Sequence, residues 1–154
     1  MSDTASIAAL VVDDMDDNLY VLGKILRDEG LDVTTAASGQ EALDALQKQH
    51  FDVVFLDIMM PEIDGFAVLQ RVRSLYSFFD LPVIMVSALD DAPSVVKAFE
   101  LGANDYITKP FDHDVLVARA FHQLDVARAL RKPAALQGKE LTKGLGNGVA
   151  GASA

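Results

Sequence analysis

Residues 51–65 read FDVVFLDIMMPEIDG, and this stretch decides the fold class. It contains an apolar run from Val53 to Leu56 that stops at Asp57. A strand buried on both faces needs such an unbroken run, whereas a sheet with one wet face alternates apolar and polar residues. Pro61 and the Asp64-Gly65 pair then mark a loop before a segment with helical spacing. The stretch therefore predicts a buried strand followed by a loop and a helix.

The rest of the chain, up to about residue 131, repeats this alternation of strand and helix. Apolar runs at 7–12 and 83–86 have the same unbroken character, and shorter strand patterns lie at 31–36 and 105–107. Segments with helical spacing separate them. We therefore expect an α/β fold in which five helices cover both faces of a five-stranded parallel sheet. Right-handed crossovers favour a doubly wound, flavodoxin-like sheet with strand order 2-1-3-4-5.

Local signals mark the starts of two helices. Ser38 and Glu41 fit a capping box, in which a hydroxyl and a carboxylate each accept from free backbone N–H groups. Asp112 is expected to cap the last helix, which runs to about Arg131. That helix carries a weak, partly apolar seam, which leaves homodimerisation through it open. The seam consists of Leu116, Ala120, Leu124, Ala127 and Arg131.

Composition limits the classes of protein. The 154 residues suit one domain, and a hydrophobic content of 51% permits a buried core. A formal net charge of −10 disfavours direct binding to nucleic-acid phosphates. The absence of cysteine excludes disulfides and thiol chemistry. No apolar run approaches the roughly 20 residues of a membrane span, and the first residues lack the basic start of a signal peptide, so we expect a cytoplasmic protein.

The composition changes near Lys132. Residues 132–154 hold five of the ten glycines, and three lysines against one glutamate. We interpret this segment as a flexible tail, a linker or residues added by cloning. The folded domain is expected to span residues 1–131.

Reactive side chains follow the predicted strands at their carboxyl ends. Asp13 and Asp14 follow the first strand, Asp57 the third, Ser87 the fourth and Lys109 the fifth. In a doubly wound sheet ligands bind at this edge, where the strand order reverses. Three carboxylates there repel one another unless a cation intervenes. An all-oxygen site without His or Cys favours a hard ion, and Mg²⁺ suits it best.

A carboxylate beside a metal ion, with an ammonium and a hydroxyl opposite, is an arrangement suited to phosphoryl transfer. Asp57 can act as the nucleophile, because carboxylates form aspartyl phosphates. The cation and the ammonium of Lys109 would then neutralise the charge on the transferred group. The residues thus predict phosphoryl chemistry at this sheet edge.

Four segments of the sequence resemble the receiver domain of two-component response regulators, the CheY-like superfamily. The resemblance covers essentially all of residues 7–131, and the motifs occur in the family's order at the ends of the corresponding elements. The segments are Val11-Val12-Asp13-Asp14, Phe55 to Gly65, Val86-Ser87-Ala88 and Tyr106 to Phe111.

The resemblance implies a metal site and a phosphoacceptor. Asp57 would accept a phosphoryl group from a histidine kinase or a histidine phosphotransfer protein. Asp13 and Asp14 would hold Mg²⁺ beside Asp57, with the backbone carbonyl of Met59 as a further ligand. The family also implies that the domain takes part in its own phosphorylation and dephosphorylation without being a conventional enzyme.

The resemblance also implies a switch. Ser87 would hydrogen-bond the phosphoryl group and Lys109 would pair with it. Tyr106 would turn inward as Ser87 moves toward the phosphate, which changes the surface made by the fourth helix, the fifth strand and the fifth helix. The Lys109–Pro110 bond is expected to be cis, which proline alone makes inexpensive. An output domain or a partner protein would read the changed surface.

Two other functions compete with this interpretation. A phosphorylation-independent interaction module would keep the fold, but the complete set of acidic residues, hydroxyl and ammonium argues against it. A phosphatase with an aspartate nucleophile usually has a second Asp two residues later as general acid. That position holds Met59, which disfavours the phosphatase.

Overall fold

The structure is a computed structural model that describes residues 6–130, so the predicted tail at 132–154 lies outside the described residues. Five strands and five helices alternate along this part of the chain. The strands are β1 (Ala8–Val12), β2 (Asp32–Ala36), β3 (Val53–Leu56), β4 (Val83–Ser87) and β5 (Asp105–Thr108). The helices are α1 (Asp16–Asp28), α2 (Gly39–Lys48), α3 (Gly65–Leu75), α4 (Ala92–Glu100) and α5 (His113–Leu130). No described helix has the length and apolar composition that a membrane span needs.

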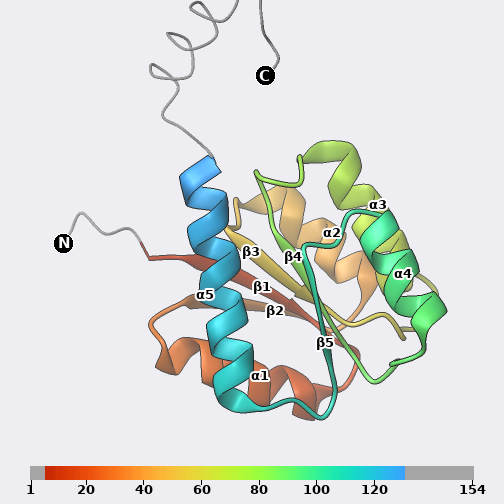
Figure 1. The fold of residues 1–154 in the computed structure, drawn as a ribbon, viewed down its shortest axis with the longest axis horizontal. Coiled ribbons are helices and arrows are strands. Elements are labelled where there is room, and N and C mark those ends of the chain that lie inside the picture. Colours follow the sequence, from red (N-terminus) through yellow and green to blue (C-terminus); the bar gives the residue numbers. More distant parts are fainter. Residues whose placement is uncertain (1–5, 131–154) are drawn as a thin grey trace, which may run out of the picture.

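All strand pairs are parallel, and the sheet order is β2-β1-β3-β4-β5, which confirms the predicted topology. Helices α1 and α5 cover one face of the sheet, and α2, α3 and α4 cover the other (Figure 1). The order reverses between β1 and β3, which lie side by side with Val12 paired to Leu56. Residues that follow these two strands therefore meet at one edge.

The unbroken apolar runs are explained by two core clusters, one on each face of the sheet. In β3, Val53 and Phe55 pack into the cluster under α1 and α5. Val54 and Leu56 pack into the cluster under α2, α3 and α4. All four side chains are fully buried. Successive residues of a strand point to opposite faces, so a strand covered on both sides has no position for a polar residue.

The helix starts largely match the local signals. Ser38 Oγ accepts from Glu41 N at 3.1 Å, as the capping box requires. The Glu41 carboxylate accepts from Ala37 N at 2.9 Å, so both side chains bind backbone N–H groups as predicted, although the usual capping box would use the N–H of Ser38 itself. Asp112 caps α5 by accepting from Val115 N at 3.0 Å.

The predicted dimer seam on the last helix is wrong, because its described residues face inward. Leu116 and Ala120 are completely buried, and Leu124 and Ala127 are nearly so. The first three belong to the core cluster under α1 and α5. A spacing of three or four residues marks one helix face but does not say what covers it. Here the domain's own sheet covers it, and Arg131 lies outside the described residues.

Gly65 sits where the start of α3 lies directly on the backbone of Asp57. A Cβ atom at this glycine would lie 2.1 Å from the Asp57 carbonyl oxygen and 2.7 Å from the Ile58 Cα. Gly65 N also donates to the Ile58 carbonyl at 2.8 Å. Only a residue without a side chain lets the helix approach this closely. The glycine therefore fixes the loop that follows Asp57.

Gly65→Ala is expected to lower the free energy of unfolding by about 1–3 kcal/mol, because the added methyl meets backbone atoms that cannot rotate away. Urea denaturation measures the change. Gly23→Ala is the matched control in α1, where the new methyl would meet the flexible end of Arg27 at 3.1 Å. The control should be neutral or stabilising, by up to about 1 kcal/mol, since alanine favours helix. Equal losses in both variants would contradict the steric explanation.

Candidate functional site

The backbone ladder continues for one residue past three strand ends and so positions the site. Asp57 N donates to Val12 O at 3.0 Å, which sets Asp57 beside the residue that follows β1. Asp13 N donates to Ala36 O at 3.1 Å, and Lys109 N donates to Ser87 O at 2.8 Å. Asp13, Asp57 and Lys109 are therefore each held to the neighbouring strand by a main-chain hydrogen bond. Their side chains emerge at one edge of the sheet.

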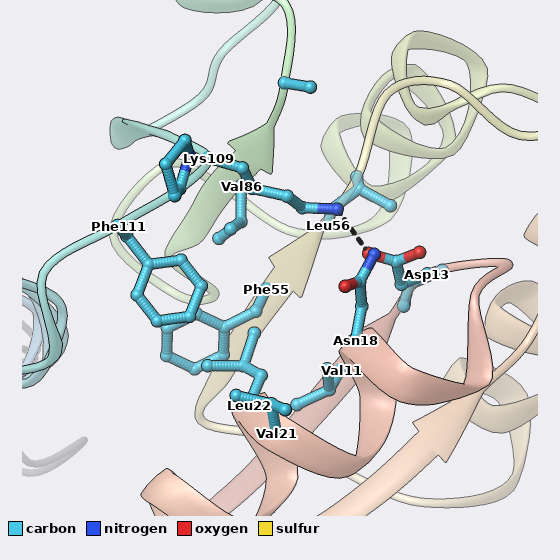
Figure 2. Close-up of a pocket in the computed structure, with 13 residues that line it drawn as sticks. Val11, Asp13, Asn18, Val21, Leu22, Phe55, Leu56, Val86, Lys109 and Phe111 are labelled. Atoms are coloured by element: carbon cyan, nitrogen blue, oxygen red, sulfur yellow. Dashed lines mark hydrogen bonds and ion pairs between the residues drawn. The ribbon is translucent and has the colours of Figure 1, made fainter.

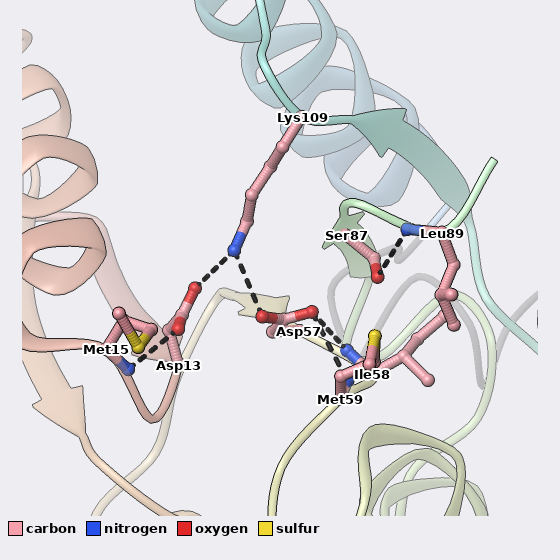
Figure 3. Close-up of polar contacts among 8 residues, drawn as sticks. All are labelled: Asp13, Met15, Asp57, Ile58, Met59, Ser87, Leu89 and Lys109. Atoms are coloured by element: carbon pink, nitrogen blue, oxygen red, sulfur yellow. Dashed lines mark hydrogen bonds and ion pairs between the residues drawn. The ribbon is translucent and has the colours of Figure 1, made fainter.

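Lys109 joins the two buried carboxylates. Its Nζ lies 2.6 Å from Asp13 Oδ2 and 3.0 Å from Asp57 Oδ2 (Figure 3). The sequence separation is 96 residues to Asp13 and 52 residues to Asp57. Both carboxylates are less than a tenth exposed, so this ion pair is shielded from water and is stronger than a surface pair.

The other oxygen of each buried carboxylate is held by the backbone. Asp13 Oδ1 accepts from Met15 N at 2.9 Å. Asp57 Oδ1 accepts from Ile58 N at 2.7 Å and from Met59 N at 3.4 Å. These contacts fix the orientation of both side chains before any ligand binds, which is the property a reactive or metal-binding carboxylate needs.

Asp14 completes an acidic cluster that fits a divalent cation. One carboxylate oxygen from each of Asp13, Asp14 and Asp57 lies within 4.8 Å of the other two. Three carboxylates and one ammonium leave an excess of two negative charges. An oxygen-only donor set with this charge suits Mg²⁺, which takes few protein carboxylates and keeps several waters. The residues present therefore fit the predicted ion.

The same contacts keep Lys109 charged. Burial alone would lower the pKa of Lys109. The hydrogen bonds that its ammonium donates to Asp13 and Asp57, together with the negative charges of these two residues, outweigh this effect, and the pKa lies above its ordinary value. The ammonium therefore persists at neutral pH and compensates part of the carboxylate charge.

Ser87 and Tyr106 meet the same residue, Leu89, from two sides. Ser87 is fully buried at the end of β4, and its Oγ accepts from Leu89 N at 3.2 Å. Tyr106 is 7% exposed, and its hydroxyl donates to Leu89 O at 2.6 Å. The tyrosine thus points inward and holds the loop between β4 and α4. No hydrogen bond joins either side chain to Asp57 or Lys109 within residues 6–130.

Two openings reach this edge of the sheet. A cleft of ≈ 480 Å³ lies between α1 and the loop that carries Lys109, with Asp13 and Asn18 on its polar side (Figure 2). A second, more open groove is lined by Met59, Leu89, neighbouring apolar residues and Asp64. The side chain of Met59 is 59% exposed. The cleft is lined by Asp13 and Lys109, and the groove by Ile58 and Met59, so both openings border the edge where Asp57 lies.

The fold and this edge define an α/β domain with an acidic site at the carboxyl ends of its parallel strands, and comparison with known families identifies its class. The family model of the response regulator receiver domain matches residues 9–121. The chain belongs to this family. Its resemblance to CheY-like receivers is thereby confirmed, and with it a place in two-component signal transduction.

Curated relatives extend beyond the part that this chain matches. The chain is 44% identical over 110 residues to a probable transcriptional regulator ycf27 of Cyanophora paradoxa, which is 71% of this chain but 45% of that protein. It is 41% identical to the uncharacterized transcriptional regulatory protein YkoG of Bacillus subtilis, of which the match covers 47%. The chain thus spans less than half the length of these relatives.

Solved structures support the same family. A CheY-like receiver domain protein from Methanospirillum hungatei has a TM-score of 0.77 at 27% identity, with 81% of this chain and 98% of that chain covered. A BeF3-activated DrrB receiver domain has a TM-score of 0.72 at 33% identity, with coverages of 79% and 99%. A response regulator/GGDEF domain protein matches with a TM-score of 0.77 at 32% identity, and 51% of that chain is covered against 80% of this one.

Tyr106→Phe is expected to lower the free energy of unfolding at pH 8 by about 0.5–1.5 kcal/mol, because it removes one buried hydrogen bond. Burial, with Asp91, Asp57 and Asp90 acting in the same direction, raises the pKa of Tyr106 above its ordinary value of 10.0. A raised pKa contributes stability that is complete below about pH 10 and is lost as the pH rises through the shifted pKa. The difference between the two proteins should therefore shrink above pH 10.

Urea denaturation between pH 8 and pH 11 measures this difference. Tyr20→Phe is the control, because Tyr20 is 68% exposed on α1. A Tyr106→Phe variant that matched this control at every pH would show that the hydroxyl does not hold Leu89.

Proposed function

We propose that the chain is a phosphorylation-dependent signalling switch in which Asp57 accepts a phosphoryl group from a histidine kinase or a histidine phosphotransfer protein. The observation that carries the proposal is the Lys109 ammonium shared between Asp13 and Asp57 beside a third carboxylate. An acidic cluster alone would not imply phosphoryl transfer. An oriented carboxylate with an adjacent, partly buried ammonium supplies both a nucleophile and charge neutralisation.

The transfer is a simple exchange of bonds at phosphorus. A carboxylate oxygen of Asp57 attacks the phosphorus of the phosphohistidine. An O–P bond forms while the N–P bond breaks, and the bonding pair leaves with the imidazole nitrogen, which takes a proton from solvent. Hydrolysis later returns the carboxylate, as water adds to phosphorus and inorganic phosphate leaves. The domain is thus a phosphoacceptor that takes part in its own dephosphorylation.

Mg²⁺ is the proposed cofactor, held by Asp13, Asp14, Asp57 and the backbone carbonyl of Met59. When bound, the ion would neutralise charge on the phosphoryl oxygens. Lys109 would pair with the phosphoryl group on the side opposite the ion. For this its ammonium has only to replace its contact to an Asp57 carboxylate oxygen with a contact to a phosphoryl oxygen. Backbone contacts at Asp13 and Asp57 hold the two carboxylates in place during this exchange.

The conformational response begins at Ser87. Its hydroxyl would leave Leu89 N for the phosphoryl group, and the loop between β4 and α4 would follow. Tyr106 already holds that loop through Leu89 O. Phosphorylation would thus shift the balance between two positions of the loop and of the surface formed by α4, β5 and α5.

The proposed partners are a phosphohistidine donor and a protein or domain that reads this surface. Because curated relatives are longer than the matched part, we propose that the receiver domain within residues 1–131 acts on an output domain or on a separate partner. The net charge of −10 disfavours direct contact with nucleic acid. A homodimer would have to use a surface other than the buried seam of α5. A cytoplasmic location accords with a donor of this kind.

The phosphatase alternative loses support at one position. Met59 is two residues after Asp57, where that chemistry places a general acid. A thioether has no proton to give. We therefore retain the switch as the single proposed function.

Asp57→Asn should reduce phosphorylation by acetyl phosphate and Mg²⁺ to background, because an amide cannot act as the nucleophile. Intact-protein mass spectrometry detects the added phosphoryl group. Asp17→Asn is the matched control, since Asp17 is an exposed acid of α1 close to the same edge. It should be labelled like the native chain. Undiminished labelling of Asp57→Asn would refute the assignment of the phosphoacceptor.

A further inference from the structure

Arg73 joins several elements at the end of the domain opposite the phosphoacceptor. From the last turn of α3, its Nε donates to Gly102 O at 2.8 Å and its Nη2 donates to Asn104 Oδ1 at 2.6 Å. Its Nη1 donates to Leu81 O at 2.9 Å and to Ser77 O at 3.3 Å. One guanidinium therefore ties α3 to the turn after α4, to the start of β5 and to the segment before β4.

The guanidinium binds neutral oxygens rather than an acid. No ion pair joins Arg73 to a carboxylate within residues 6–130, and the ring of Phe78 lies 5.7 Å from the guanidinium carbon. Burial lowers the pKa of Arg73 to about 10, so the group stays charged at neutral pH. A planar fork with five donors can hold several carbonyls at once, which a lysine cannot do.

Gly102 and Asn104 both have features that allow the contact with Arg73. Gly102 has a φ of +106°, and a Cβ there would lie 2.9 Å from Arg73 Cγ. Asn104 Oδ1 also accepts from Val83 N at 2.8 Å, and its Nδ2 donates to Phe78 O at 2.9 Å. The segment 102–104 is thus held by main-chain and side-chain hydrogen bonds to three other elements.

The opposite end of α4 is held much more weakly. Only Ala98 of this helix is fully buried. Ala88 and the four residues at 90–93 are exposed. The cap of α4 is local, with Asp91 accepting from Ser94 N at 3.0 Å. The loop that begins at Ser87 reaches the core through the Leu89 and Tyr106 contact. Helix α4 therefore has one anchored end and one loose end.

We propose that Arg73 is the fixed point of the switch, so that α4 pivots about Gly102 when the loop after β4 moves, instead of sliding along the sheet. The proposal rests on the proposed phosphorylation switch. One end of α4 is held by hydrogen bonds to α3, to the segment before β4 and to β4, while its other end lies on an exposed loop. Such a helix can absorb a local change only by rotation at the held end. Arg73 is here a positioning residue, with no contact to the reacting atoms.

The test compares amide chemical shifts of the whole chain, by NMR, with and without Mg²⁺ and beryllofluoride. In the native chain the changes at residues 87–95 should exceed those at 101–104 by about threefold or more, since a pivot moves its free end most. Arg73→Met keeps the aliphatic stem but removes the fork. In this variant the chemical-shift changes at 101–104 should become nearly as large as those at 87–95.

Two further variants separate this role from ordinary stability. Arg71→Met is the matched control, because Arg71 is exposed on the same helix, and it should behave like the native chain. Arg73→Lys covers the case in which Arg73→Met does not fold, and it should give an intermediate pattern. Hydrogen exchange without ligand supplies a second readout. The amide of Asn104, which donates to Val83 O, should exchange about tenfold faster in Arg73→Lys, as expected for local opening.

Three outcomes would contradict parts of the proposal. Chemical-shift changes at 101–104 of the native chain that are as large as those at 87–95 would overturn the pivot. If the chemical-shift changes at 101–104 were as small in the Arg73 variants as in the native chain, the role of Arg73 would be overturned. If beryllofluoride changes no amide at all, including that of Ser87, the proposed function itself fails. That result differs from the first two because the signal is missing at the phosphoacceptor.

Discussion

The mutual repulsion of three carboxylates at one sheet edge is the constraint on which the rest of the structure depends. Asp13 and Asp57 are buried within reach of each other, and such a pair persists only if positive charge compensates it. Lys109, which follows β5, supplies that charge. Together with Asp14, the cluster still has more carboxylates than ammonium groups, a charge balance that suits a divalent cation. The sheet order places β1 beside β3, and this brings the carboxylates that follow the two strands close together.

The rigid and movable parts of the domain follow from how each end of the sheet is bonded. At the end of the sheet that carries Asp57, main-chain hydrogen bonds hold the charged residues, while the loop after β4 is held by two contacts to Leu89. At the other end, Arg73 binds carbonyls from several elements at once. In the proposed switch, a change of charge at Asp57 would therefore act first on the weakly held loop after β4 and last on the segment that Arg73 holds.

Much of this could be predicted from sequence because it depends on burial and chain order. Unbroken apolar runs identified the buried strands, and residues after strand ends identified Asp57 and Lys109. The roles of Leu89 and Arg73 could not be found this way. Leu89 acts through its backbone, which every residue possesses, and Arg73 is one arginine among others on an amphipathic helix. The apolar seam of α5 was misassigned because its spacing fits a dimer as well as the domain's own core.

Paramagnetic broadening by Mn²⁺, used in place of Mg²⁺, tests the meeting of the three carboxylates most directly. Amide signals of Asp13, Asp14 and residues 57–59 should broaden first, and excess Mg²⁺ should restore them, because both ions prefer oxygen ligands. Asp14→Asn should require more Mn²⁺ for the same broadening, while the broadened signals remain those of the same residues. Broadening centred on Asp16 and Asp17, or spread evenly over the acidic surface, would contradict a cation site built from the ends of β1 and β3.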